Sequence, residues 1–297
     1  MLSRIATFVL LSLALGCGEP RAAATVGGGG VRDDFGAPVA GGTTRTPARI
    51  VSLIPGATEL LFAIGAGPRV VGRTEWDVWP DSARLVPDVG PGLRPNVEAV
   101  LARHPDLVVL YASDDDRPAA ARLRAAGVRV IALRIDRIED FRRAALLLGA
   151  ATGELARARL TADTVARALA RVRAATAGLP RPRVFWHVWD APVITIGRGS
   201  FLDELLDVAG GRNVYADAAS PSPTTSIEDI IRRDPDVILA GPVGAARIRA
   251  SAAWRAVGAV RRGRVLVVDT NLVGRPSVRM GEAAASIARL IHPGALP

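Results

Sequence analysis

The sequence predicts an α/β protein in which two lobes with parallel sheets are joined by one long backbone helix. The first observation is an internal repeat, because the segment 96–110 matches the segment 226–240 without a gap. The second is the stretch from Thr152 to Thr176, which lies between the two copies and has the pattern of a single helix. Short apolar runs alternate with helical segments in the rest of the chain, and this alternation favours parallel sheets.

The two repeat copies read NVEAVLARHPDLVVL and SIEDIIRRDPDVILA. Each copy predicts a capped helix, a Pro-Asp turn and a buried strand. The identical pairs are Glu98 with Glu228, Arg103 with Arg233, Pro105 with Pro235 and Asp106 with Asp236. The repeat therefore indicates two lobes of like construction, an N-terminal lobe over 49–150 and a C-terminal lobe over 179–297.

The predicted helix between the copies carries one narrow apolar stripe. Its small or apolar residues recur at steps of three and four, at Leu155, Ala158, Ala162, Val165, Leu169 and Val172. About 25 residues at 1.5 Å each make a rod of roughly 38 Å, long enough to run the length of a small lobe. Gly178, Pro180 and Pro182 end it, so we assign the backbone helix to 151–178.

The first 17 residues, MLSRIATFVLLSLALGC, have the pattern of an export signal. The apolar run from Ile5 to Leu15 is too short for a permanent membrane span but suits the core of a secretory signal. Its LALGC ending resembles a bacterial lipobox, which implies that Cys17 is lipidated and begins the mature chain; an ordinary signal peptide is the alternative. Residues 18–48 are rich in glycine, threonine and proline and predict a flexible tether.

The remaining elements follow from apolar runs bounded by glycine, proline and polar turns. The expected strands outside the repeat are 49–53, 70–72, 128–133, 183–189, 193–196 and 264–269. The expected helices are 59–64, 119–126, one that ends at Leu148, one that Ser200 caps and Gly210 ends, and 278–291. Loops at the carboxyl ends of such strands, among them the loop TEWDVWP from Thr74, are where ligands bind in open α/β sheets.

Composition argues against several classes of function. All 38 positive side chains are arginine, and the formal charge of +9 is spread along the helices without a basic run interleaved with aromatics, so a nucleic-acid partner is not expected. Without lysine there is no Walker A loop and no lysine Schiff base, and no G-x-S-x-G elbow is present. Three scattered histidines do not form a metal site. We therefore expect no enzyme, no metal site and no cofactor.

The segments RIVSLIPGATELLFAIGA and SFLDELLDVAGGRNV, with the repeat and the long helix, resemble the substrate-binding proteins of ABC importers for vitamin B12, iron-siderophores and haem. The resemblance covers 49–292 and is to the type with a helical backbone, called class III. It implies two Rossmann-like lobes that flank one helix and hold the ligand in the cleft between them. It also implies a partner, an ABC permease dimer with its ATPase.

The resemblance implies that Glu98 and Glu228 dock into arginine pockets on the permease dimer. Each stands in the first turn of a predicted helix, one on each lobe. A carboxylate at a helix N-terminus stays ionised and suits a charge-assisted pair with a guanidinium group. The alternative is that each only complements its helix dipole.

The candidate ligand-binding residues are Trp76, Trp79, His187, Trp189, Arg198 and Arg275. The tryptophans lie on loops at strand ends, where a flat conjugated or chelate ligand can stack on an indole ring. By resemblance Trp76 and Arg275 align with cleft residues of the B12 binders, whereas Gly92, Val188 and Ser222 stand where those proteins carry other cleft aromatics. The alternatives are loop packing for the tryptophans, a core position for His187 and a simple glycine turn for Arg198.

We expect an extracytoplasmic solute-binding lipoprotein in the periplasm or cell envelope, a monomer held to the membrane through its N-terminal lipid only. It would capture a corrinoid or chelated-iron ligand and deliver it to the permease. Two alternatives stay open, a lipid-anchored ligand sensor without transport and a two-lobed chelatase-like or transferase-like enzyme. The ligand stays open among corrinoid, ferric siderophore and haem.

Overall fold

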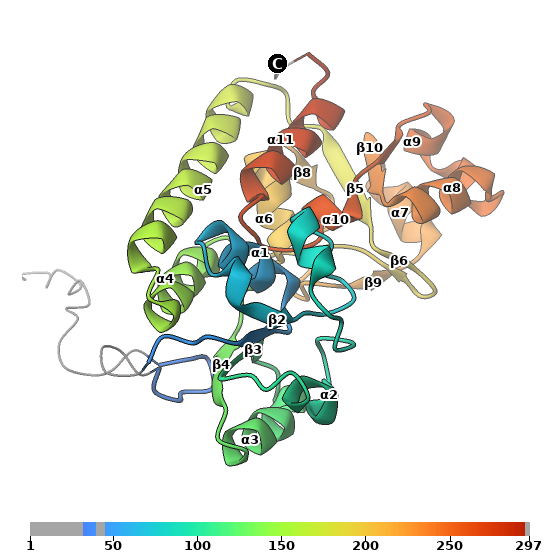
Figure 1. Ribbon diagram of the computed structural model, residues 1–297. Coiled ribbons are helices and arrows are strands. Elements are labelled where there is room, and N and C mark those ends of the chain that lie inside the picture. Colours follow the sequence, from blue (N-terminus) through green and yellow to red (C-terminus); the bar gives the residue numbers. More distant parts are fainter. Residues whose placement is uncertain (1–31, 40–44, 295–297) are drawn as a thin grey trace, which may run out of the picture. The chain divides into compact units, whose positions relative to one another are not determined.

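Two four-stranded parallel sheets form the frames of the two lobes in the computed structural model, which describes residues 32–39 and 45–294 (Figure 1). The N-terminal sheet has the order β2-β1-β3-β4 and the C-terminal sheet the order β8-β5-β10-β11. When the four parallel strands of each lobe are numbered along the chain, both sheets have the order second, first, third, fourth. All pairings within the two sheets are parallel. The predicted fold class is confirmed.

The elements of the N-terminal lobe are β1 (Ile50–Ser52), α1 (Pro55–Ala63), η1 (Gly67–Arg69), β2 (Val70–Gly72), η2 (Asp81–Leu85), α2 (Val97–Leu101), β3 (Leu107–Tyr111), η3 (Asp114–Asp116), α3 (Arg117–Ala125), β4 (Arg129–Leu133) and α4 (Asp140–Thr152). Those of the C-terminal lobe are β5 (Arg183–His187), β6 (Trp189–Asp190), β7 (Val193–Ile194), α6 (Phe201–Val208), β8 (Arg212–Asn213), β9 (Thr224–Thr225), α7 (Ile227–Arg233), β10 (Val237–Ala240), α8 (Pro242–Ala250), η4 (Ala253–Ala256), α9 (Gly258–Arg261), β11 (Val265–Val267), α10 (Thr270–Val273) and α11 (Met280–Ile291).

The long helix is α5 (Leu155–Thr176), which runs beside α4 and α11 (Figure 1). It begins later than predicted, because Thr152 still belongs to α4 and Gly153 ends that helix in the left-handed conformation with φ of 76°. The predicted stripe is buried from Ala158 to Val172, while Leu155 is half-buried.

Alanines let the neighbouring helices approach α5 closely. A Cβ added at Gly149 of α4 would lie 2.4 Å from the Cβ of Ala158, and one at Gly281 of α11 would lie 2.3 Å from the Cβ of Ala168. Both glycines thus bring a helix backbone into contact with α5 where no side chain fits. The long helix is therefore packed tightly against both lobes.

The segment predicted as a flexible tether differs from the prediction where the structure describes it. The Asp34 N–H donates to the carbonyl of Ala132 on β4 at 2.9 Å, and the buried Asp33 carboxylate pairs with Arg124 of α3 at 3.0 Å. Val39 belongs to the apolar core cluster that also contains Ile50 and Leu107 of the N-terminal sheet. Residues 32–39 therefore pack on the edge of this lobe. The described residues do not include 1–31, which contain the signal segment and Cys17, or 40–44.

The C-terminal lobe also has a small antiparallel sheet, β6-β7-β9, in which β6 and β7 follow β5 along the chain and β9 follows β8. We predicted strands over 183–189 and 193–196, which include β6 and β7, but predicted neither β9 nor the antiparallel pairing. Among the helices described, none has the length and apolar character needed to cross a bilayer.

Candidate functional site

A hollow of about 510 Å³ lies at the carboxyl edge of the N-terminal sheet. Its lining residues come from the loops after β1 and β2, the loop before α2 and the end of β3, namely Leu53, Ile54, Pro55, Thr74, Trp76, Pro91, Gly92, Leu93 and Tyr111. The chain reaches this edge from three separate strands because parallel strands end on the same side of a sheet. The lining is mostly apolar, which suits a ligand with a large apolar surface.

Large apolar side chains are exposed around the carboxyl edges of both sheets. Trp76 is 60% exposed and Leu93 61% exposed at the N-terminal edge. Trp189 is 62% exposed just after β5, and Val243 is 65% exposed just after β10. Exposed apolar side chains that gather at one place mark a binding surface more often than scattered ones do. Both lobes therefore present apolar surface where ligands bind in folds of this kind.

Arg275 connects the two lobes beside the hollow. It lies in the C-terminal lobe between α10 and α11, and its Nη1 donates to the carbonyl of Trp76 at 2.9 Å. Trp79, on the same loop as Trp76, is half-buried, and the Arg279 guanidinium lies 5.3 Å from the centre of its ring. The structure thus brings Trp76 and Arg275 together and packs Trp79, on the same loop, against Arg279. That any of the three contacts a ligand stays a prediction.

His187 lies in the core of the C-terminal lobe and not on the surface of the cleft. It is 5% exposed, its ring is 6.0 Å from that of Trp254, and its Nε2 lies 3.0 Å from the Asp190 carboxylate. Burial lowers the pKa of His187, and Asp190 opposes this shift only in part. Its burial argues against a ligand contact and favours the alternative of a core histidine.

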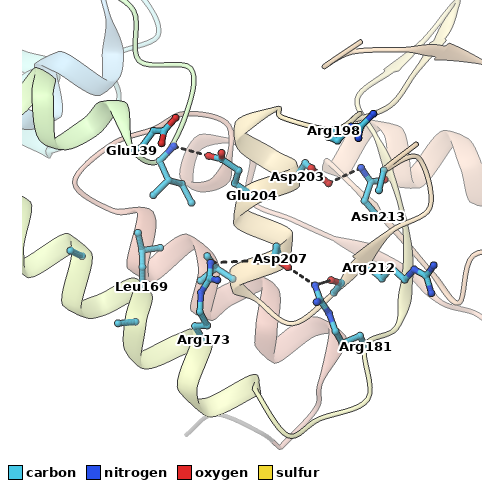
Figure 2. A pocket seen from close by; sticks show the side chains of 16 residues that line it. Glu139, Leu169, Arg173, Arg181, Arg198, Asp203, Glu204, Asp207, Arg212 and Asn213 are labelled. Carbon is cyan, nitrogen blue, oxygen red and sulfur yellow. Dashed lines mark hydrogen bonds and ion pairs between the residues drawn. The ribbon is translucent and has the colours of Figure 1, made fainter. Parts of the chain in front are cut away.

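Arg198 lines a different and larger cavity, of about 1050 Å³, between α5 and α6 (Figure 2). The backbone N–H groups that could have held an anion there are used, because Arg198 N donates to Ala218 O and Gly199 N to the Asp203 carboxylate. The other polar side chains of the cavity are largely paired with one another, with Asp203 bound to Asn213 and Asp207 to Arg181 (Figure 2). The structure therefore separates Arg198 from the other candidates.

The sequence analysis missed Leu93 and Val243, whose exposure becomes visible only when the strand ends are placed in space. It did single out Gly92 as a departure from the B12 binders. A Cβ at Gly92 would lie 2.2 Å from the carbonyl oxygen of Leu53, so the backbone here leaves no space for a side chain. Tyr111 lines the hollow, and its hydroxyl donates to Asp136 at 2.7 Å. Burial, supported by Asp136, raises the pKa of Tyr111 to about 12, so its phenol stays protonated.

Glu98 and Glu228 are both exposed, each in the first turn of its helix. The Asn96 side chain caps α2 and the Ser226 side chain caps α7. The pKa of Glu98 is lowered by its own backbone N–H and by Arg122, and that of Glu228 by the Ser226 hydroxyl and its own backbone N–H. Both carboxylates therefore stay ionised below the ordinary carboxyl range. Their docking role stays a prediction.

The described residues contain no group of three or more His, Cys, Asp or Glu side chains that could hold a metal ion.

Comparison with known proteins identifies the family. A model of periplasmic binding proteins matches residues 50–272. The cobalamin-binding protein of Halobacterium salinarum is 33% identical over 264 residues, which cover 83% of this chain and 70% of that protein. An uncharacterized substrate-binding lipoprotein of an ABC transporter in Bacillus subtilis, YvrC, is 30% identical over 257 residues, covering 84% of this chain and 81% of that protein.

Solved structures agree with these relatives. The periplasmic vitamin B12 binding protein BtuF of Vibrio cholerae superposes with a TM-score of 0.72 at 25% identity, over 82% of this chain and 96% of that one. The periplasmic heme-binding protein RhuT of Roseiflexus gives a TM-score of 0.75 at 25% identity, over 83% of this chain and 98% of that one. Since the family model spans most of the sequence and the fold has the two lobes and the backbone helix that the resemblance implies, this chain belongs to the periplasmic binding protein family.

Proposed function

We propose that this protein is an extracytoplasmic solute-binding lipoprotein that captures a corrinoid or chelated-iron ligand between its lobes and delivers it to an ABC permease. The observation that carries the proposal is the exposure of Trp76 and Trp189 at the carboxyl edges of the two sheets. An indole that is 60% exposed has apolar area to bury, and a flat conjugated ligand gains stacking as well as burial there.

The relatives favour the same class of ligand. Those at 30% identity or more include a cobalamin-binding protein and vitamin B12-binding proteins, and similar solved structures include B12-binding and heme-binding proteins. A corrinoid and a haem share a flat conjugated macrocycle, which fits an apolar hollow rimmed by indoles. We propose the ligand as cargo and not as a cofactor.

Delivery requires a partner, and the two exposed carboxylates supply a means of docking. We propose that Glu98 and Glu228 each enter an arginine pocket of a permease dimer that its ATPase drives. Lipidation of Cys17 would keep a monomeric protein in the periplasm or cell envelope near that permease.

A titration tests capture. Protein lacking residues 1–17 is titrated with cyanocobalamin, cobinamide, haemin and ferric chelates while tryptophan fluorescence is followed. We expect saturable submicromolar quenching by one ligand, weakened about tenfold by Trp76→Ala, since one stacked and buried indole contributes roughly 1.5 kcal/mol or more. Leu85→Ala is the control, because Leu85 is exposed but does not line the hollow. Failure of all these ligands to bind, or equal binding by Trp76→Ala, would contradict the proposal.

A further inference from the structure

The two lobes touch directly beside the hollow, where α1 meets the segment 275–279. A Cβ added at Gly56 would lie 2.3 Å from the carbonyl oxygen of Pro276, so the first turn of α1 has no space between it and the other lobe. In the same region Arg275 donates to the carbonyl of Trp76. We call α1 with Asp77 on one side, and the segment 275–279 on the other, the inter-lobe joint.

Two acidic side chains are buried in this joint. Glu59 of α1 is 2% exposed, and Asp77 is 1% exposed. One oxygen of Asp77 accepts the backbone N–H of Thr74 at 2.9 Å and the Thr74 hydroxyl, while the hydroxyls of Ser277 and Thr58 act on the Glu59 and Asp77 carboxyls, respectively. The remaining oxygens, Oε2 of Glu59 and Oδ1 of Asp77, are buried without a hydrogen-bond partner among the described residues. Unpartnered buried carboxylate oxygens are rare and costly, so a pair of them in one place needs an explanation.

The charges in the joint do not balance when both acids are ionised. The charged groups that act on Glu59 are Arg275, Arg279 and Asp77, and Arg275 acts on Asp77 as well. Arg279 is already engaged, since its Nε and Nη2 each lie 2.9 Å from the Glu282 carboxylate. Arg275 must then balance the negative charges of both carboxylates. One added proton brings the net charge of the joint to zero.

We propose that Glu59, Asp77 and Arg275 form a proton-dependent joint that holds the two lobes together and positions the Trp76 loop at the hollow. With one proton bound, the two buried acids and the half-buried Arg275 carry no net charge, and the hydrogen bond from Arg275 to the Trp76 carbonyl joins the lobes beside them. Loss of that proton leaves two buried like charges with the charge of Arg275 to oppose them, and separation of the lobes then relieves the desolvation. Arg275 is accordingly a positioning residue, whose charge acts on both acids and whose Nη1 is bound to the Trp76 carbonyl.

The direction of the pH dependence follows from burial. Burial raises the pKa of both Glu59 and Asp77 above their ordinary values, and the Arg275 charge and the hydrogen bonds oppose this only in part. An acid with a raised pKa in the folded state contributes stability that is present below its unfolded pKa and is lost as the pH rises through the folded value. The joint is therefore tightest in acid and loosens from the ordinary carboxyl range upward. This inference goes beyond the proposed function, because the joint exists without any ligand.

Distance measurements between the lobes test the joint in the free protein. The full chain carries Cys17→Ser, so that two introduced cysteines, Ala121→Cys on α3 and Ala246→Cys on α8, are the only thiols; both positions are exposed. Spin labels on them report the inter-lobe distance by pulsed electron paramagnetic resonance as the pH is raised from about 4 to about 9, a range that spans the ordinary and raised carboxyl values. We expect the distance distribution to shift to longer values and to broaden as the pH rises.

The matched variant is Glu59→Gln with Asp77→Asn, which keeps the shape of both side chains but cannot lose the proton. Its distribution should stay narrow and short at every pH, and its free energy of unfolding should exceed that of the wild type increasingly as the pH rises. Asp116→Asn, at a buried acid outside the joint, should keep the wild-type response. A wild-type distribution that does not change with pH, or a double variant that follows the wild type, would overturn the proposal.

Discussion

The two copies of the repeat share their backbone contacts but differ in the side chains that hold their helices. In both lobes the aspartate after the proline accepts the N–H of the arginine that precedes or begins the first strand, Arg49 N to Asp106 at 3.1 Å and Arg183 N to Asp236 at 2.8 Å. The turn before that proline passes through a left-handed residue in each copy, His104 with φ of 48° and Asp234 with φ of 36°. The identical residues of the repeat are thus those that connect helix, turn and strand.

The difference begins at the position after each glutamate. The C-terminal copy has Asp229, whose carboxylate accepts the Tyr215 hydroxyl at 2.7 Å and Nε of Arg233 at 2.9 Å. The N-terminal copy has Ala99 there, which can do neither. Arg103, the counterpart of Arg233, accordingly has a buried Nε without a hydrogen-bond partner among the described residues. Hydrogen bonds among Asp229, Tyr215 and Arg233 therefore stabilise α7, and α2 lacks the equivalent bonds.

The glutamates themselves differ in the same way. Glu98 pairs with Arg122 of α3, whereas Glu228 is hydrogen-bonded to its own helix cap at Ser226 and has no ion pair among the described residues. The two copies of the repeat therefore share the fold of the motif but differ in the partner of its glutamate. If both acids dock, Glu98 must first give up a partner that Glu228 does not have.

The largest effect expected from this difference is on stability. Arg233→Ala removes contacts to Asp229, Asp217 and the Tyr215 ring, and we expect it to lower the free energy of unfolding by about 2 to 3 kcal/mol. Arg103→Ala should cost less than about 1 kcal/mol, since its buried Nε makes no hydrogen bond to another described residue. Urea unfolding measures the loss of unfolding free energy in each variant. Equal losses would contradict the proposed difference between the two copies.

A smaller effect is expected on docking. Arg122→Gln frees Glu98 from its intramolecular partner, and because an exposed ion pair contributes about 0.2 to 1 kcal/mol, docking should strengthen by at most about fivefold. Affinity for the detergent-solubilised permease and ATPase complex, measured by biolayer interferometry, reports it. Arg157→Gln on α5 removes the same charge elsewhere and should leave the affinity as it was. Unchanged docking by Arg122→Gln would show that the pair does not compete.

The architecture could be predicted because its signals are local and repeated. Several features depend only on residues that are near one another in the sequence, and the structure has them. They are the Pro-Asp turns, the caps at Asn96 and Ser226 and the apolar stripe of α5. Exposure of Glu98 and Glu228 followed from their place in the first helical turn. The boundary at Gly153 was missed because alanine-rich sequence continues the helical pattern across it.

The rest depends on contacts between residues far apart in the sequence. Residues 32–39 pack on the lobe through the ion pair of Asp33 with Arg124. The periodicity of the sequence does not predict such a long-range contact. His187 follows four strand residues and was placed in the cleft, but the strand ends inside the lobe, against Trp254. Arg275 was predicted to face ligand, and the joint with Glu59 appears only when the two lobes are seen together.

The proposed delivery requires that the two lobes act as one carrier and that each lobe presents one acid to a permease. The measurement that tests this most directly is cellular uptake of the ligand found by titration, with Glu98→Arg and Glu228→Arg combined in one protein. We predict that uptake falls to background while the purified variant binds ligand as tightly as the wild type does. Uptake at the wild-type rate by that variant would contradict the account.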